Sequence, residues 1–549
     1  MSLNSTQRTA TLAATQAVTY DLLVIGGGIT GAGIALDAAS RGLKTLLVEM
    51  QDFGAGTSSR STKLIHGGLR YLKQFEFKLV REVGRERAIL FRNAPHIVIP
   101  EKMLLPVYRG GSFNRLSLRF GLWFYDRLAG VKRSERRKML NRAQTMVQEP
   151  LLSGKNLQGA GIYSEYRTDD ARLVIEVIKT AVREGATALN YCRAEELTYA
   201  DGKVTGAQVR DLVTDASHQV RAQYVVNAAG PWVDGIRKLD GSEKGKRLHH
   251  TKGVHLVVPH KRLPLRQATY IDAPDGRMVF IIPRQLWTYI GTTDTSFKGD
   301  LAHPRTTAAD VRYLLEATNT AFSEAKITQA DISSTWAGIR PLIHEEGKSP
   351  SELSRKDEIF YSDTGLVTIA GGKLTGFRKM AEKVVDVVAE RMNRAGGNVG
   401  RCVSDQIGLE GGSLGNRRSL AEFVEHLQRE SGVARKEVEW LAGLFGSNAR
   451  QILDWAAELE GEEELRITRA AVRYAVEHEG ARTLGDFFIR RSALLYFGRE
   501  WIAPVLDLVA DELRTWLGDD HVVDPEQEFA RMYREVVEFP KDDFAVAAV

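Results

Sequence analysis

A glycine pattern near the start of the chain constrains its fold more than any other feature. An apolar run over 22–25 leads into Gly26, Gly28 and Gly31, and a second apolar run ends at Glu49. This order predicts a buried strand, a tight turn at Gly26, a helix and a second buried strand. Gly28 would let a pyrophosphate approach the backbone, and Gly31 would let the helix lie close to the sheet. We therefore expect a dinucleotide site in an α/β domain, with Glu49 accepting hydrogen bonds from an adenosine ribose.

The composition of the 549 residues is that of an ordinary globular protein, with 43% hydrophobic and 26% charged residues, and the length predicts two to four domains. A net charge of +5 is too small to indicate nucleic-acid binding, and no apolar run reaches the ~18 residues of a membrane span. Cys192 and Cys402 have no metal-type spacing, so we expect no metal site, no disulfide framework and a reducing, cytosolic location. Residues 1–18 lack an apolar signal core and are expected to form a disordered leader.

Three further stretches have the composition of ligand-binding loops. Residues 51–72 become small, polar and glycine-rich, which suits a loop that surrounds a polar ligand, and Arg70 and Tyr71 at its end suit a small anion. Residues 224–232 read as a buried strand that ends in small residues. Residues 366–381 read as a strand, a glycine turn and a helix. All three are expected to approach a cofactor.

The middle of the chain changes from an α/β pattern to a run of strands. After a hairpin turn at 201–202, strands are expected over 254–259, 270–272, 278–283 and 287–291, which indicates an antiparallel sheet. From about residue 412 the composition becomes helical and carries no catalytic motif, which predicts an all-α domain.

Residues 112–144 combine aromatic side chains with a basic cluster. This pattern is typical of a helix that lies on an anionic bilayer surface, and somewhat more often of a partly buried helix with a solvated basic face. The sequence leaves both interpretations open.

Taken together, these segments resemble the FAD-dependent glycerol-3-phosphate dehydrogenases, the respiratory, quinone-linked enzymes. The resemblance covers the chain from about residue 20 to the C-terminal helices. It rests on the glycine pattern, on the stretch 57–71 that ends in His-Gly-Gly-Leu-Arg-Tyr, and on 229–232, 339–342 and 371–375. It implies an α/β FAD-binding domain of the glutathione-reductase (Rossmann) type, an antiparallel-sheet substrate domain and an all-α C-terminal domain. The expected bounds are 19–95, 160–248 and 350–395 for the FAD-binding domain, 96–159 and 249–349 for the substrate-binding domain, and 405–545 for the helical domain.

The resemblance also implies site residues. Those expected to bind the substrate are Arg70, Tyr71, His255, Arg340 and Lys373, and the last three are also the catalytic candidates. Those expected to bind FAD are Gly26, Gly28, Gly31, Glu49, Thr57, Ser58, Ser59, Lys63, Leu64, Gly230, Gly372, Lys373, Leu374 and Thr375. One departure is visible: many members of that family have Thr-Tyr where this chain has Gly376 and Phe377, a difference that we do not expect to change the reaction.

The reaction implied is oxidation of sn-glycerol 3-phosphate to dihydroxyacetone phosphate, with hydride transfer to flavin N5 and electrons passed to a membrane quinone. His255 is the first candidate for the base because its ordinary pKa lies near working pH, while Arg340 could instead stabilise an alkoxide. We expect a cytoplasmic protein held peripherally at the inner face of the cell membrane, with an anionic membrane surface as a partner, no nucleic acid, and a homodimer left open. The alternatives are a glycerol-3-phosphate oxidase that uses oxygen, a flavoprotein acting on a 2-hydroxy acid or an amino acid, and a flavin-containing RNA-modifying protein. The RNA-modifying protein would need a concentrated basic groove.

Overall fold

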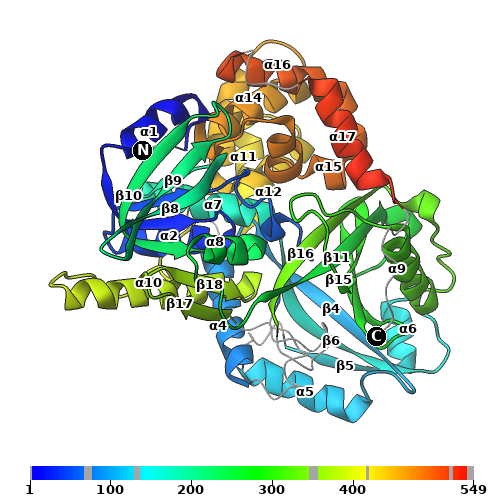
Figure 1. Cartoon of the computed structure of the whole chain (residues 1–549). Coiled ribbons are helices and arrows are strands. Elements are labelled where there is room, and N and C mark those ends of the chain that lie inside the picture. The colour runs from blue at the N-terminus through cyan, green and yellow to red at the C-terminus, as the bar shows by residue number, and fades with distance from the viewer. Residues whose placement is uncertain are drawn as a thin grey trace.

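The computed structural model describes residues 3–66, 77–128, 136–344, 357–415, 419–518 and 524–540. Within these residues the chain forms two large sheets, and a body of C-terminal helices lies against both (Figure 1). The α/β, antiparallel and all-α parts predicted from the sequence are therefore all present.

Sheet A carries the glycine pattern. Its central strands are parallel and nearly continuous apolar runs, because both faces are buried, one by helices and the other by an antiparallel hairpin and the N-terminal helix. Helices α2 (Ile29–Ser40), α7 (Asp170–Arg183) and α10 (Phe377–Arg394) pack side by side. The strand order is β17 (Asp357–Tyr361), β18 (Val367–Gly371), β10 (Ser217–Asn227), β1 (Thr19–Ile25), β2 (Thr45–Val48), β7 (Thr187–Leu189), and the hairpin β8 (Cys192–Ala200) and β9 (Lys203–Asp211) extends β10.

Sheet B is antiparallel except where β12 runs parallel to β4. In β11 the side chains alternate between a core and the face turned toward sheet A, so register decides which residues reach the site. The strand order is β15 (Thr295–Ser296), β11 (Leu248–Pro259), β14 (Trp287–Gly291), β13 (Met278–Arg284), β12 (Ala268–Asp272), β4 (Val98–Tyr108), β6 (Leu157–Thr168), β3 (Leu64–Ile65), with β16 (Ser334–Ile343) on β11 and β5 (Lys138–Asn141) on β6.

The remaining helices flank sheet B, follow β10 or form the C-terminal domain. Sheet B is flanked by α4 (Phe77–Asn93), α5 (Arg115–Leu128), α6 (Arg142–Gln148) and α9 (Ala308–Ala321), and α8 (Val233–Leu239) follows β10. No helix among the described residues combines the length and apolar character that crossing a membrane requires. The C-terminal helices are α11 (Leu420–Ser431), α12 (Arg435–Phe445), α13 (Ala449–Ala457), α14 (Glu463–Glu479), the π-helix η9 (Asp486–Arg491), α15 (Leu494–Phe497), α16 (Leu506–Leu517) and α17 (Pro525–Val537).

The N-terminal segment differs from the expected disordered leader. Helix α1 (Arg8–Thr15) follows a short turn at η1 (Ser5–Gln7), and Leu12 is buried. Arg8 forms a buried ion pair with Asp211 at 2.7 Å. The expectation of disorder was wrong because a polar, signal-free composition says nothing about distant partners that can bind such a segment.

One expected domain boundary also differs. The limit at 159/160 falls inside β6, which belongs wholly to sheet B, and β3 pairs with β6 although it lies within 19–95. The sequence alone does not show which of the two sheets a given strand joins.

Candidate functional site

A cavity lies where parallel strands of sheet A end. Their carboxyl-terminal residues and the turns that follow line it, which is the position at which such sheets bind ligands. The lining includes Ile25, Gly26, Gly28, Ile29, Thr30, Val48, Glu49, Ala55, Gly56, Thr57, Ser58, Cys192, Arg193, Ala194, Ala229, Gly230, Trp232, Pro341, Gly372, Lys373 and Leu374.

The phosphate end of the cavity is built from the predicted glycines. Gly26 has φ +114°, and a Cβ there would stand 2.5 Å from the carbonyl oxygen of Ala228. A Cβ at Gly31 would overlap the carbonyl oxygen of Gly26, so the helix lies as close to the strand as predicted. The N-terminus of α2 opens on the cavity through Gly28 and Ile29, and helix N-termini favour phosphate groups. This cradle fits the pyrophosphate of FAD.

Glu49 stands beside this turn. Its carboxylate oxygens accept hydrogen bonds from the backbone N–H groups of Gly27 at 2.6 Å and Gln51 at 2.8 Å. Burial raises the pKa of Glu49, although these hydrogen bonds oppose the shift. The carboxylate is therefore fixed in place at the wall where a ribose would lie.

Three further lining residues are marked by no sequence pattern: Cys192, Arg193 and Ala194. They open β8, and the backbone N–H of Cys192 donates to the carbonyl oxygen of Glu49 at 2.7 Å. No motif marks them, because an edge hairpin brings them to Glu49 through tertiary packing.

The predicted cofactor residues of the loop after β2 divide into two groups. Thr57 and Ser58 line the cavity; Thr57 donates to the carbonyl oxygen of Ile339 at 2.6 Å, and Ser58 accepts from Ile29 N–H at 3.0 Å. Ser59 and Lys63 are buried and do not line it, and Lys63 is instead ion-paired with Asp170. Leu64, in β3, is also outside the lining.

The opposite wall comes from the turn between β18 and α10. Gly372 has φ +87°, and Gly372, Lys373 and Leu374 line the cavity together with Gly230. Thr375 is buried next to them and accepts a hydrogen bond from the backbone N–H of His66 at 3.2 Å.

Phe377, at the departure from the Thr-Tyr pattern, packs between two helices. Its ring is buried, and a Cβ added at Gly33 of α2 would stand 2.7 Å from it. The side chain at this position therefore fills the contact between α2 and α10.

Arg340 lies on sheet B, next to the lining residue Pro341, but does not itself line the cavity. It pairs in register with Thr251 of β11, and its guanidinium lies over Gly253, where a Cβ would stand 2.6 Å from Cζ. It donates to the carbonyl oxygen of Thr293 at 3.0 Å and forms an ion pair with Asp294 at 3.2 Å. Glycine in the strand makes room for the arginine.

His255 lies on the same face of β11. Its ring stacks on Trp336, with centroids 4.7 Å apart, and Nε2 is 2.9 Å from the hydroxyl of Thr62. Burial, with a smaller contribution from Arg340 and then Lys63, lowers the pKa of His255 well below 6.5. The imidazole is therefore neutral at neutral pH, and the expectation that its pKa lies near working pH is wrong because burial disfavours the protonated form.

The predicted pair Arg70 and Tyr71 lies outside the described residues. Of the remaining substrate candidates, Lys373 lines the cavity, whereas Arg340 and His255 share one face of sheet B and do not line it.

Comparisons with known proteins agree with this architecture. A family model described as "FAD dependent oxidoreductase" matches residues 21–378, and one described as "C-terminal domain of alpha-glycerophosphate oxidase" matches 402–521. The aerobic glycerol-3-phosphate dehydrogenase of Bacillus subtilis (strain 168) is 52% identical over 501 residues, covering 90% of each chain. That of Staphylococcus aureus (strain USA300) is 47% identical over 506 residues, covering 90% of this chain and 91% of the relative.

A solved structure is similar over the whole molecule. The glycerol-3-phosphate dehydrogenase from Bacillus halodurans, complexed with FAD, superposes with a TM-score of 0.83 at 42% identity, covering 99% of this chain and 100% of that chain. The cavity described above has the cradle that FAD requires, so FAD is the cofactor. The chain belongs to the FAD-dependent oxidoreductase family and, within it, to the aerobic glycerol-3-phosphate dehydrogenases.

Proposed function

We propose that this chain oxidises sn-glycerol 3-phosphate to dihydroxyacetone phosphate and passes the electrons to a membrane quinone. The observation that carries the proposal is the placement of Arg340 and His255 on one face of the β11–β16 pair, where Pro341 adjoins the cavity. Similarity to the dehydrogenases of the two relatives supports the same substrate.

Positive charge suits the phosphate of this substrate. Arg340 and Lys373 supply it from two sheets, and the planar guanidinium can bind phosphate through two parallel hydrogen bonds. An ion pair with Asp294 at 3.2 Å holds the Arg340 guanidinium in position. Arg70 is the third basic residue proposed for this role.

The proposed base is His255. Its Nε2 is 2.9 Å from the hydroxyl of Thr62, and Nδ1 is buried with no hydrogen-bond partner among the described residues. When bound, FAD supplies the two-electron oxidising equivalent that alcohol oxidation needs. The alcohol loses two electrons and two protons, and a quinone reduced to a quinol takes up the same number.

The experiment is an anaerobic titration of the holoenzyme with sn-glycerol 3-phosphate while the oxidised flavin band is recorded. We expect bleaching by this enantiomer and recovery of the band on adding a quinone analogue. Arg340→Ala should lose bleaching at substrate concentrations that saturate the parent, whereas Arg262→Ala, an exposed arginine paired with Asp331, should not. A normal flavin spectrum that the substrate does not bleach would refute the substrate. Rapid peroxide release in air, with no response to quinone, would make the protein an oxidase.

We also propose that helix α5 rests on the inner face of the cell membrane, where the quinone is found. Leu116, Phe120 and Trp123 are 79%, 65% and 41% exposed and follow one another at helical spacing along one stripe. The guanidinium of Arg127 lies over the Trp123 ring at 5.6 Å, as expected for a basic group at the edge of an apolar stripe.

The charge of this helix favours an anionic bilayer. Arg115, Arg119 and Arg127 are exposed, and the one acidic residue of α5, Asp126, is buried and paired with Arg137. Aromatic stripes with flanking basic residues bind such surfaces. Figure 1 shows α5 at the edge of the molecule, away from the C-terminal helices.

Vesicle sedimentation tests this surface. A Phe120→Ser, Trp123→Ser double variant should lose most of its binding to phosphatidylglycerol vesicles and keep its turnover with a water-soluble quinone analogue. Leu286→Ser, which removes a 61% exposed leucine from a turn of sheet B, is the matched control and should bind like the parent. Undiminished binding by the double variant would refute the assignment.

A further inference from the structure

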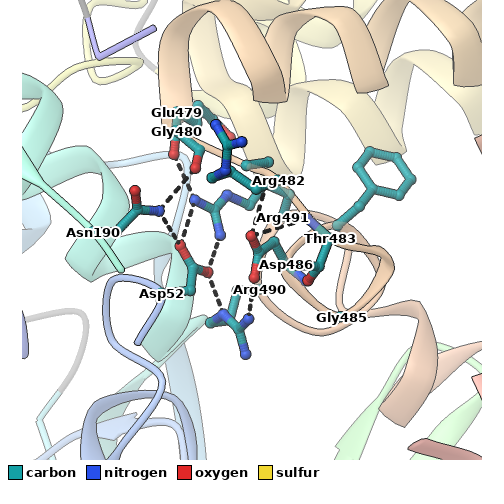
Figure 2. A network of polar contacts seen from close by, with 12 residues as sticks. Asp52, Asn190, Glu479, Gly480, Arg482, Thr483, Gly485, Asp486, Arg490 and Arg491 are labelled. Atoms are coloured by element: carbon teal, nitrogen blue, oxygen red, sulfur yellow. Dashed lines mark hydrogen bonds and ion pairs between the residues drawn. The ribbon is translucent and has the colours of Figure 1, made fainter. Parts of the chain in front are cut away.

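A network of buried charges connects the cofactor loop to the C-terminal domain (Figure 2). Asp52, in the loop after β2, is 1% exposed, and four hydrogen bonds reach its two carboxylate oxygens. Asn190 donates to Oδ1 at 3.1 Å and Arg491 donates to Oδ1 at 3.0 Å. Oδ2 accepts from both Arg490 and Arg491. One carboxylate of the FAD-binding domain is thus enclosed by two arginines of helix η9.

The two arginines are themselves held in place. Arg490 donates through its other end to Asp486 at 2.6 Å, and Asp486 also accepts from the hydroxyl of Tyr191 at 2.7 Å. Asn190 donates to the carbonyl oxygen of Gly480 at 2.8 Å. Burial alone would raise the pKa of Asp52, but Arg491 and Arg490 outweigh it and lower the pKa, so the carboxylate is charged. The C-terminal domain therefore contacts the loop after β2 and the segment between β7 and β8, both of which adjoin residues that line the cavity.

Asp52 does not line the cavity, but residues on both sides of it do. Glu49 precedes it, and Gly54, Thr57 and Ser58 follow it. The backbone N–H of Gly54 donates to the carbonyl oxygen of Gly27 at 3.0 Å, which joins the loop to the phosphate turn. Movement of Asp52 would therefore move the wall of the FAD site.

Phe53 makes the same connection by packing. A Cβ at Gly27 would stand 2.9 Å from its ring, and a Cβ at Gly480 would stand 3.4 Å from it. The ring lies between the phosphate turn and the C-terminal domain, next to the charged cluster.

We infer that the C-terminal domain is part of the FAD-binding apparatus, with Asp52 as a positioning residue that acts through Arg490 and Arg491. This domain supplies no residue to the lining among the described residues, so its contribution to the cofactor is entirely indirect. The inference rests on FAD as the cofactor and is independent of the proposed substrate.

The test measures the rate of FAD release from the diluted holoenzyme, followed by the rise in free-FAD fluorescence. Asp52→Asn should release FAD at least tenfold faster than the parent, and so should Arg491→Gln, which lies 439 residues away in another domain. The double variant should release FAD no faster than the worse single variant, because both changes break one connection.

Asp310→Asn is the matched control. It breaks an ion pair of similar burial, with Lys252 at 2.6 Å, on the far side of sheet B from the cavity. It should unfold at lower temperature and yet release FAD within twofold of the parent rate. The inference is overturned if Arg491→Gln lowers the melting temperature as Asp310→Asn does while its FAD release stays at the parent rate.

Discussion

Replacing Gly26 with alanine tests how strictly the cavity depends on the turn after β1. The new Cβ would stand 2.5 Å from the carbonyl oxygen of Ala228, 2.8 Å from its carbonyl carbon and 2.9 Å from the Cα of Ala229. All three atoms belong to the backbone, so no side chain can rotate to relieve the contact. The residue would also keep φ near +114°, which L side chains rarely adopt.

The structure sets the size of the effect. Overpacking a close-packed site costs about 1–3 kcal/mol, and a sparsely populated backbone conformation costs about 1–3 kcal/mol more. Without FAD the turn can relax, whereas bound pyrophosphate requires Gly26 and Gly28 in place, so the cost falls on the bound state. At the lower limit of about 2 kcal/mol, FAD would bind about 30-fold more weakly.

The assay is titration of apoprotein with FAD, followed by quenching of tryptophan fluorescence, since Trp232 lines the cavity. Gly235→Ala is the control, because a Cβ there meets nothing within 4 Å and the residue lies inside α8. Alanine favours helix by about 1 kcal/mol, so this variant should bind FAD normally and be no less stable. Binding of FAD by Gly26→Ala at the parent affinity would refute the reasoning.

Three further outcomes follow from the charges of the site and its supports. Because the pKa of His255 lies well below 6.5, its titration should not affect kcat/KM between pH 6 and 7. Any inflection of the kcat/KM profile in that range should therefore persist in His255→Asn. Burial alone would raise the pKa of Glu479, but Arg172 and Lys179 lower it to about 2, so its contribution to stability is complete above its ordinary pKa of 4.5. That contribution should be lost as pH falls from 4.5 toward 2, and the protection of 463–479 against amide hydrogen exchange should lack this pH dependence in Glu479→Gln. Arg340→Lys keeps the charge but loses the planar fork, so steady-state kinetics should give a KM at least about tenfold higher, equal to about 1.4 kcal/mol.

The parts of the fold that local pattern predicts are those in which short-range signals agree. Gly26 and Gly28 lie in the turn after β1 and Gly31 lies in the first turn of α2, and their spacing predicted the cradle together with the flanking strands, the helix and Glu49. The hairpin expected at 201–202 joins β8 to β9, because a turn residue pair between alternating strands is a local signal. The strand around His255 was likewise readable from its period of two, which put that side chain on the face now seen toward Arg340.

The rest depends on contacts between segments far apart in sequence. Cys192 reaches the cavity because β8 contacts β2. Lys63 was expected to bind FAD, and the sequence around it gives no sign that Asp170 pairs with it instead. Asp52 likewise gives no local sign that two arginines more than 430 residues away enclose it. Buried ion pairs of this kind are specified by three-dimensional complementarity, which no spacing rule encodes.

The buried ion pair between Arg8 and Asp211 holds the N-terminal segment in place and can be tested directly. Arg8 is 4% exposed; besides its ion pair with Asp211 it donates to the carbonyl oxygen of Asn190 at 2.8 Å. Arg8→Ala would leave Asp211 buried without its partner. Two local hydrogen bonds to Asp211 remain, so we expect the lower end of the usual cost, about 3 kcal/mol.

A global free energy of unfolding is ill-defined for several packed domains, so the measurement is local amide hydrogen exchange. Exchange in 8–15 of Arg8→Ala should rise by roughly 100-fold, since about 1.4 kcal/mol corresponds to tenfold. Arg210→Ala is the control, because its pair with Asp215 is exposed and such pairs contribute little. If Arg8→Ala left 8–15 as protected as in the parent, the helix would be held by the packing of Leu12 instead of the buried charge pair.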